Sequence, residues 1–285
     1  MKKGVLIFAH NNSKVDYSLT AIIAGGLAKK NLGVPVSLAT DQWTLEWMKE
    51  SGTFEKANVV FENIILVDGP NEDNNRKLHD GADSAIVPFR NGNRPKAWDV
   101  TPYERTLLID SDFLIFTDHL NNYWDVDEDV MIGKSVNDLC DQDRLGYHDR
   151  YVSDTGVHLW WATTVMFTKN EKSKSFFSLI DSIKDSYDSY GDLYRFDARQ
   201  YRNDISFSIA NHIFSGFATD MNSQLPQLLT ASDKDVLYKV DADGKLTFLL
   251  MQPAGFIAAA IKDMDIHIMN KQSIVRNATA LLELI

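Results

Sequence analysis

Short apolar runs alternate with a helical pattern over the first third of the chain, and this alternation restricts the possible folds more than any other feature of the sequence. The runs have the length of buried strands, and they occupy residues 4–9, 34–39 and 64–67. Between the first two, residues 19–27 carry apolar side chains at helical spacing, and Gly33 is placed to end that helix. Strands that alternate with helices pair in parallel through right-handed crossovers. We therefore predict an α/β fold with a Rossmann-like, mostly parallel sheet flanked by helices.

The remainder of the chain is less regular. Residues 69–95 are polar and rich in Asn, Asp and Gly, so we predict a long loop there. Ser273 is predicted to cap the last helix. Further helices are predicted at 96–101, 176–183 and 205–214, and further strands at 106–109, 130–133, 160–167, 236–240, 246–250 and 266–269. The turn at residues 241–244 joins two of these strands. We predict one domain over residues 1–285, with a nucleotide-sugar-binding half (1–117) and an acceptor-binding half (118–285) that includes a smaller mixed region.

Composition excludes several classes of protein. The chain of 285 residues is long enough to bury a full core, and its single cysteine, Cys140, cannot form an internal disulfide. The formal net charge of -11 disfavours nucleic acid as a partner, and it is compatible with a cation that brings anionic nucleotides to the protein. The longest apolar stretch, residues 246–261, is too short and interrupted to span a membrane. We expect a soluble, cytoplasmic protein without a signal peptide.

The strongest chemical signal is a pair of carboxylates at the end of a predicted strand. Residues 106–109 are apolar, Asp110 and Asp112 follow them, and apolar residues resume at once. In open parallel sheets ligands bind outside the carboxyl ends of the strands, and paired carboxylates there suit Mg²⁺ or Mn²⁺. The same Asp-x-Asp pattern occurs where we expect solvated loops or turns, at 125–127, 141–143 and 241–243.

Residues 102–112, Pro-Tyr-Glu-Arg-Thr-Leu-Leu-Ile-Asp-Ser-Asp, resemble the segment that ends in Asp-x-Asp in GT-A fold glycosyltransferases. The similarity is greatest to the family 8 group, which includes glycogenin and lipopolysaccharide galactosyltransferases. This resemblance implies a GT-A-like fold, a UDP-linked sugar as donor and Mn²⁺ or Mg²⁺ as cofactor. It implies that Asp110 contacts the metal or the ribose, and that Asp112 binds the metal.

Residues 265–271 resemble the C-terminal His-x-x-Gly-x-x-Lys segment of family 8, although the glycine is missing and the lysine is closer. The resemblance implies that His267 is the third metal ligand and that Lys271 contacts the diphosphate. A histidine on a short strand is also commonly structural, and both readings of His267 stay open at this point.

The resemblance also implies a set of nucleotide-binding residues in the first hundred positions. Ala9, His10 and Asn11 follow the first strand, where backbone groups hold the nucleoside, and Asp41 follows the second, where it would contact the base. Lys96 opens the helix before the Asp-x-Asp strand and would approach the nucleotide. Tyr17 would lie either against the base or in the core. The implied nucleotide-binding residues are therefore Ala9, His10, Asn11, Tyr17, Asp41 and Lys96.

Three groups of residues have competing interpretations. Asp204 is the first candidate for a catalytic carboxylate, and either it or Asn203 is equally suited to cap the helix that follows. Of Trp160 and Trp161, we expect one in the core and one on the acceptor side. The scattered histidines at positions 148, 158 and 212 lack metal-ligand spacing and are predicted to be structural or superficial.

These features together predict a metal-dependent glycosyltransferase that moves a sugar from a nucleoside-diphosphate sugar to a hydroxyl group. The similarity to family 8 implies retention of the anomeric configuration, which requires no dedicated base. A saccharide is the expected acceptor, and a modified DNA base is a second possibility. Two alternatives are a nucleotidyltransferase, which also uses paired carboxylates and a metal, and a non-catalytic module that binds a nucleotide or a sugar.

Overall fold

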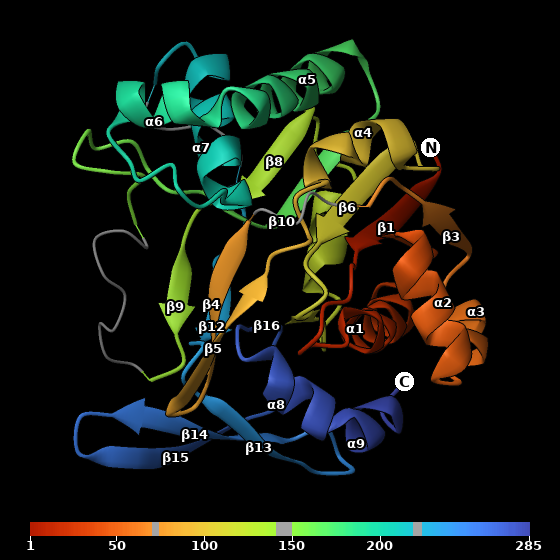
Figure 1. Ribbon diagram of the computed structural model, residues 1–285. Coiled ribbons are helices and arrows are strands. Elements are labelled where there is room, and N and C mark those ends of the chain that lie inside the picture. The colour runs from red at the N-terminus through yellow and green to blue at the C-terminus, as the bar shows by residue number, and fades with distance from the viewer. Residues whose placement is uncertain (70–73, 141–149, 219–223) are drawn as a thin grey trace.

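A seven-stranded sheet forms the centre of the molecule (Figure 1). The computed structural model describes residues 1–69, 74–140, 150–218 and 224–285, so the predicted loop pair 141–143 and the histidine at 148 lie outside the described residues. The strands lie in the order β11 (Gln224–Leu225), β8 (Val130–Gly133), β10 (Trp161–Thr168), β6 (Arg105–Ile109), β1 (Lys3–Phe8), β2 (Val36–Thr40) and β3 (Asn63–Leu66). All of them run in one direction except β10, which is antiparallel to both its neighbours. The predicted α/β fold with a mostly parallel central sheet is confirmed.

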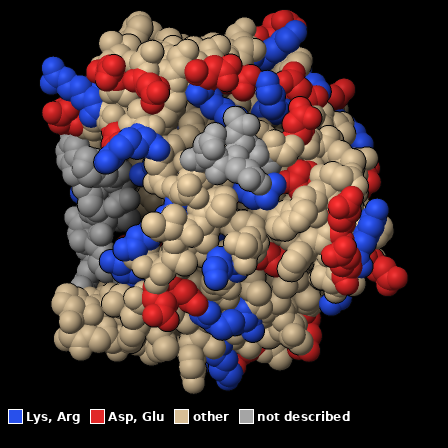
Figure 2. Space-filling view, in the orientation of Figure 1, with Lys and Arg blue, Asp and Glu red and all other residues tan. Residues whose placement is uncertain are grey.

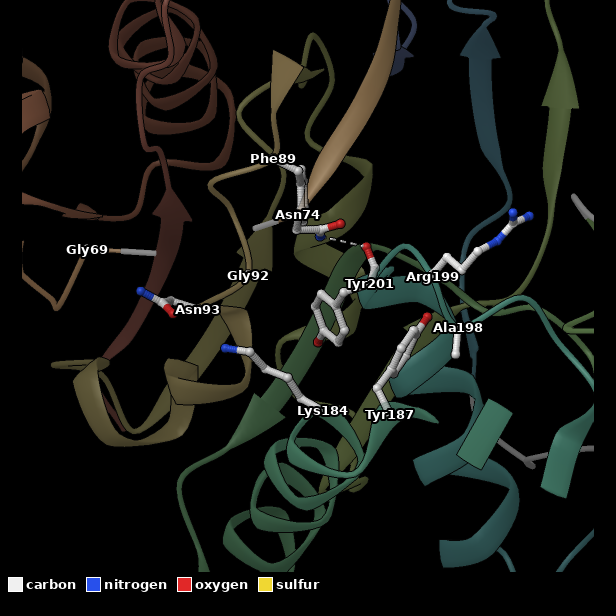
Figure 3. Close-up of a pocket in the computed structure, with 10 residues that line it drawn as sticks. All are labelled: Gly69, Asn74, Phe89, Gly92, Asn93, Lys184, Tyr187, Ala198, Arg199 and Tyr201. Atoms are coloured by element: carbon white, nitrogen blue, oxygen red, sulfur yellow. Dashed lines mark hydrogen bonds between the residues drawn. The ribbon is translucent and has the colours of Figure 1, made fainter. Parts of the chain in front are cut away.

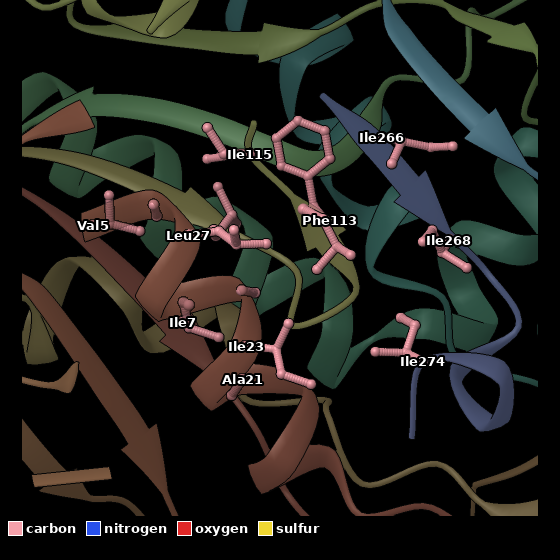
Figure 4. Close-up of a cluster of buried hydrophobic side chains, with 14 of the residues drawn as sticks. Val5, Ile7, Ala21, Ile23, Leu27, Phe113, Ile115, Ile266, Ile268 and Ile274 are labelled. Carbon is pink, nitrogen blue, oxygen red and sulfur yellow. The ribbon is translucent and has the colours of Figure 1, made fainter. Parts of the chain in front are cut away.

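Both faces of this sheet are buried, as the continuous apolar run of β1 predicts. Val5 and Ile7 point into the core beneath α1 (Tyr17–Leu32), whereas Leu6 and Phe8 point into the core beneath α5 (Glu171–Asp185) and α7 (Asn203–Phe214). Successive side chains of a strand face opposite sides, so a strand with a core on each side has no position for a polar residue. Figure 4 shows the first core, in which β1 and α1 meet apolar side chains of β16 (Ile266–Ile268) and α8 (Lys271–Arg276).

Helix α1 begins and ends at the residues that its local chemistry favours. The Asp16 carboxylate caps the helix by accepting the Leu19 amide at 2.9 Å. Gly33 ends it in the left-handed conformation at φ 67°, as predicted, and donates its amide to Lys29. The other helices are α2 (Gln42–Glu50), α3 (Phe54–Val60), η1 (Arg94–Lys96), α4 (Ala97–Val100), η2 (His119–Tyr123), α6 (Tyr187–Tyr194) and α9 (Ala278–Leu282).

Two smaller sheets lie beyond the carboxyl end of β6. One has the order β7 (Phe113–Leu114), β16, β12 (Leu228–Ala231) and β9 (Val136–Asp138). The other contains β13 (Val236–Val240), β14 (Leu246–Gln252) and β15 (Gly255–Ile261), and the predicted turn at residues 241–244 joins its first two strands. Strand β7 directly follows the Asp-x-Asp motif, so the first of these sheets continues the chain from the central sheet.

The prediction of a long loop at residues 69–95 is wrong. This region contains an antiparallel hairpin, β4 (Asn75–Asp80) and β5 (Asp83–Pro88), and the start of η1. Gly81 occupies the two-residue turn at φ 62°, a conformation that glycine adopts without steric cost. The hairpin shows no apolar pattern in the sequence because few of its own side chains are buried. Ile86, for example, is 77% exposed. The partners of the hairpin are tertiary ones, such as the ion pair between Asp80 and Arg276 of α8.

The prediction that Ser273 caps the last helix is also wrong. Asn270 is the cap of α8, and its side chain accepts the Ser273 amide at 3.1 Å. Ser273 lies inside the helix, and its hydroxyl donates to the Asn270 carbonyl at 2.7 Å. Asn270 is fully buried and also binds the β4–β5 hairpin through Asp80, so its tertiary contacts fix the helix start.

Candidate active site

Two strands bring the predicted metal ligands together from opposite parts of the chain. Asp110 and Asp112 leave the carboxyl end of β6, and His267 is the middle residue of β16. Strand β16 pairs with β7 so that His267 lies opposite Phe113, and the Ile268 amide donates to the Asp112 carbonyl at 2.9 Å. One ligand atom from each of Asp110, Asp112 and His267 lies within 4.8 Å of the other two.

Asp112 is the most strongly paired carboxylate of this cluster. Its Oδ2 lies 2.5 Å from Lys271 Nζ and 3.3 Å from His267 Nε2, and its side chain is 3% exposed. Burial favours the neutral acid, but the charges of Lys271 and His267 outweigh it and lower the pKa of Asp112. Burial opposes the charge of Lys271 as well, yet the Asp112 carboxylate raises the pKa of this lysine. Asp112 and Lys271 therefore form a charged pair.

Arg94 is a residue of the cluster that the sequence analysis missed. It is 1% exposed, and its Nη1 contacts Oδ1 of Asp110, whose side chain is 23% exposed. Within the described residues, its Nε and Nη2 have no hydrogen-bond partner. Burial raises the pKa of Asp110; the Arg94 charge counteracts this shift, and the Asp112 carboxylate adds to it. The available signal was a basic residue two positions before the predicted Lys96.

Lys96 does not take the expected place. Its ammonium is exposed on the surface and pairs with Asp181 of α5 at 2.5 Å. The turn at η1 points Arg94 inward and Lys96 outward, so the cation beside the cluster is Arg94. Tyr17 is half-buried at the first position of α1, where it packs against the core. Desolvation raises the pKa of its phenol, and Lys271 and Asp112 are the charges that act on it most strongly.

The residues after β1 and β2 form a buried polar network. His10 Nδ1 lies 3.2 Å from Asp41 Oδ2, and the Asp41 side chain caps α2 by accepting the Thr44 amide at 2.6 Å. Burial acts to raise the pKa of Asp41, but the hydrogen bonds from His10 and Thr44 lower it to about 2. Arg90 also approaches Asp41 Oδ2, at 3.7 Å. Asp41 is thus committed to internal partners, whereas no described residue bonds to the buried Nε2 of His10.

Ala9 and Asn11 are likewise engaged inside the protein. The Ala9 amide donates to Ala39 and its carbonyl accepts the Thr40 hydroxyl, both bonds to the second strand. The Asn11 amide donates to the Thr44 hydroxyl at 2.9 Å. These bonds join the end of β1 to the end of β2 and to the start of α2, on either side of His10 in the chain.

The predicted cap at Asn203 or Asp204 is wrong, because the helix-cap position of α7 falls on Arg202 and carries no side-chain cap. Asp204 Oδ1 instead accepts the Ala162 amide of β10 at 3.2 Å, and its Oδ2 lies 3.5 Å from Arg202. Asn203 donates to the Asn91 carbonyl at 3.0 Å. Both side chains therefore bond to residues distant in the sequence or outside the helix start. The charge of Asp204 also raises the pKa of Asp110.

The two adjacent tryptophans lie in different surroundings. Trp160 belongs to the core beneath α5, and its amide donates to Ser208 of α7 at 2.7 Å. Trp161 meets the ring of His267 edge to face, with 6.1 Å between ring centroids. Trp161 lies beside the cluster, but it is also buried, in the core beneath α1, so the expectation that only one of the two tryptophans lies in a core is wrong. Of the other histidines predicted to be structural, His158 stacks on Tyr151 and His212 contacts Tyr194.

The donor set fits a hard divalent cation. Two ligands bound at 2.0–2.1 Å at right angles lie about 3 Å apart, and His267 Nε2 lies 3.3 Å from Asp112 Oδ2. Although Lys271 and His267 approach this oxygen closely, it accepts no well-aligned hydrogen bond from the described residues. The two carboxylates match the preferences of Mn²⁺ and Mg²⁺, whereas the imidazole is a softer ligand that Mg²⁺ accepts less readily than Mn²⁺. The ammonium of Lys271 competes for the same oxygen and must yield when a cation binds.

The surface carries few basic residues, and their placement is uneven. Figure 2 shows several Lys and Arg side chains around a hollow on this face, while acidic side chains gather toward its rim. Among the described helices, none has both the length and the apolar character required to cross a membrane.

Comparison with known proteins gives no family assignment by sequence. No protein-family model matches the chain, and neither does any curated protein. Solved structures that it resembles include the galactosyltransferase LgtC in complex with donor and acceptor sugar analogs, at 15% identity and a TM-score of 0.45, over 72% of this chain and 70% of that one.

Two further examples show a similar level of likeness. The glycosyltransferase GlyE of Streptococcus pneumoniae TIGR4 gives 15% identity and a TM-score of 0.40, over 79% of this chain and 45% of that one. The inositol-1-phosphate CTP transferase of T. maritima gives 13% identity and a TM-score of 0.40, over 76% and 82%. At this level of identity and TM-score the function has to be argued from the site.

Proposed function

We propose that the protein is a metal-dependent glycosyltransferase that moves a sugar from a nucleoside-diphosphate sugar, UDP-linked, to a hydroxyl acceptor. The observation that carries this proposal is the convergence of Asp110, Asp112 and His267 within 4.8 Å at the carboxyl end of β6. This edge of a parallel sheet is where α/β proteins bind nucleotides. A cluster of two carboxylates and an imidazole there suits a cation that binds a diphosphate.

Each charged residue of the cluster has a role in this proposal. Asp110, Asp112 and His267 would hold Mn²⁺ or Mg²⁺, and the bound cation would supply Lewis-acid stabilisation of a diphosphate leaving group. Lys271, displaced from Asp112, places its ammonium against a phosphate oxygen. Arg94 orients Asp110, and its Nε and Nη2, which have no hydrogen-bond partner among the described residues, donate to the donor sugar.

We propose retention of the anomeric configuration, and the surroundings of Asp204 support this choice. An inverting enzyme needs a carboxylate that accepts a proton from the acceptor hydroxyl. Both oxygens of Asp204 already have partners, Ala162 and Arg202, so this carboxylate is better suited to positioning than to proton transfer. NMR analysis of the product anomer tests the proposal, and an inverted anomer would contradict it.

A saccharide is the proposed acceptor, since the net charge of -11 opposes the approach of DNA. Incubation of the protein and Mn²⁺ with a panel of oligosaccharides, and with duplex DNA that contains hydroxymethylated bases, tests the choice. Transfer to the DNA alone would overturn it.

A thermal-shift screen tests the donor and the metal. UDP-sugars with Mn²⁺ should raise the unfolding midpoint, because a ligand that binds only the folded state stabilises it by RT ln(1 + [L]/Kd). Asp112→Asn should abolish this rise, whereas Asp127→Asn should retain it. Asp127 belongs to an exposed Asp-x-Asp pair and is the matched control.

Product analysis separates this function from nucleotidyl transfer, which releases pyrophosphate. Phosphorus NMR of the reaction mixture should show a nucleoside diphosphate from a sugar donor. Release of pyrophosphate from a nucleoside triphosphate, or the absence of any metal-dependent thermal shift with nucleotide sugars, would refute the proposal.

A further inference from the structure

A second hollow lies beside the candidate active site and has no role in metal or nucleotide binding as proposed above. It has a volume of about 350 Å³ and lies between residues 69, 74 and 89–93, the end of α5, the start of α6 and the segment before α7 (Figure 3). Phe89, Tyr187 and Tyr201 supply aromatic side chains to its wall. Pockets with apolar walls and a few placed polar groups are typical of small-molecule sites.

The polar groups of this pocket are unusual for so acidic a protein. Its lining contains Lys184 and Arg199 and no carboxylate, although the chain has 40 acidic residues. Arg199 is engaged with Asp197, but Lys184 has no ion-pair partner among the residues that the structure describes. In Figure 3 the ammonium of Lys184 projects into the space between Tyr201 and Asn93. It lies 3.9 Å from where a side chain at Gly92 would begin, so the glycine leaves room beside it.

Two further polar atoms at this pocket are buried without a partner. Tyr201 Oη and Asn74 Oδ1 form no well-aligned hydrogen bond with any described residue, although the Ser206 hydroxyl lies near Tyr201 Oη. Buried polar groups normally have partners, because their desolvation is otherwise uncompensated. Burial also lowers the pKa of Lys184, and the charges of Asp181 and Asp185, which act in the opposite direction, do not cancel this shift. A ligand with an anionic group and hydroxyl groups would satisfy all three side chains.

The pocket is joined to the active site along the chain at two places. Gly92 and Asn93 line it, and Arg94, the next residue, contacts Asp110. Tyr201 lines it as well, and the following turn carries Arg202 and Asp204. A ligand in the pocket therefore lies beside the segments that hold the candidate catalytic groups.

We propose that this pocket binds a sugar residue that carries a negative charge, and that this residue is part of the acceptor. Lys184 pairs with the charged group, Tyr187 and Tyr201 contact the sugar ring, and Asn74 and the Tyr201 hydroxyl bind its hydroxyl groups. The charge belongs to a carboxylate or a phosphate ester, and both chemistries pair with an ammonium. The role as an acceptor subsite rests on the proposed glycosyl transfer, whereas the binding itself does not.

Binding of three simple probes tests the proposal on the full chain without nucleotide or metal. Isothermal titration and saturation-transfer NMR should show that glucuronate or glucose 6-phosphate binds at least tenfold more tightly than glucose. The tighter of the two anions identifies the source of the charge. Lys184→Met, which keeps the length and apolar stem of the side chain, should remove this preference.

Two further variants make the result specific to the pocket. Lys174→Met, on the same helix, removes an exposed lysine outside the pocket and should leave binding unchanged. Tyr201→Phe keeps the ring, removes the unpartnered hydroxyl, and should weaken binding several-fold. Equal binding of glucose and the two anions, no binding of any probe, or an unchanged affinity in Lys184→Met would overturn the proposal.

The metal-dependent shift with UDP-sugars, measured on the same Lys184→Met protein, distinguishes the two proposals. This shift should persist in the variant, which also shows that the protein is folded. If the shift is absent in the wild type while anionic sugars still bind, the proposed function fails and the pocket remains. If the shift is present and the sugars do not bind, only the pocket assignment fails.

Discussion

The contact between Arg94 and Asp110 predicts an asymmetry between two single substitutions. Arg94 is 1% exposed, whereas the Asp110 side chain is 23% exposed. Water can therefore hydrate Asp110 after Arg94 is removed, but it cannot hydrate Arg94 after Asp110 is removed. If Asp110 is replaced with Ala, a guanidinium stays buried without a counter-ion. If Arg94 is replaced with Met, the carboxylate that remains can be hydrated.

The size of this asymmetry follows from the burial of the two groups. Removal of one partner from a buried ion pair costs about 3–5 kcal/mol, and Asp110→Ala should fall in that range because Arg94 is enclosed. Arg94→Met should cost less, about 1–2 kcal/mol, because it also removes Nε and Nη2, two buried nitrogens without partners whose desolvation each costs about 1–3 kcal/mol. The double variant should resemble Arg94→Met alone.

Urea denaturation of the four proteins, without metal or nucleotide, measures these free energies of unfolding. The expected order of stability is wild type, then Arg94→Met together with the double variant, then Asp110→Ala. A coupling energy near zero would show that the contact stabilises nothing. Greater destabilisation by Arg94→Met than by Asp110→Ala would refute the reasoning from burial.

Three further predictions concern single positions. Asp112→Asn should lower transfer by about 10²–10³-fold in a UDP-sugar assay, the loss typical of a group that stabilises transition-state charge; activity within a factor of three would exclude it as a metal ligand. Asp41 has a pKa of about 2 in the folded protein against 3.8 for the model compound, so it stabilises the fold above pH 4 and loses this contribution, about 2 kcal/mol, as pH falls toward 2. As pH falls from 5 to 2, the urea midpoint should therefore decrease less steeply in Asp41→Asn than in the wild type. Parallel curves for the two proteins would count against a lowered pKa of Asp41. Gly4→Ala should cost about 1–3 kcal/mol, because the added carbon would lie 2.5 Å from the buried Tyr103 ring; Gly69→Ala, in open space, is the control for the same melting experiment, and equal melting temperatures would contradict the packing argument.

The sequence alone was sufficient for the parts of the fold that depend on local pattern. The apolar run of β1 is long enough to require a core on each face, and both cores are present. Gly33 ends α1 because it adopts φ 67° at little cost. The position of Asp110 and Asp112 at the end of β6 also follows from the sequence, since the strand pattern stops at Ile109.

The polar contacts were not accessible from the sequence, because they depend on which distant segments meet. Nothing local distinguishes Arg94 from Lys96 as the cation at Asp110; the turn of η1 decides it. The hairpin at β4–β5 lacks an apolar signature, because ion pairs and hydrogen bonds to other elements hold it in place.

The same division applies to the candidate site. Sequence similarity suggested His267 as a ligand, but only the pairing of β16 with β7 places its imidazole 3.3 Å from Asp112. Asp204 had the pattern of a helix cap, and the proximity of β10 gave its carboxylate a different partner. The steric and hydrophobic preferences of neighbouring residues determine the strands and the turns, and they place the carboxylate motif at the end of a strand. The charge pairs that make the site require packed segments from both halves of the chain, and so the tertiary structure alone decides them.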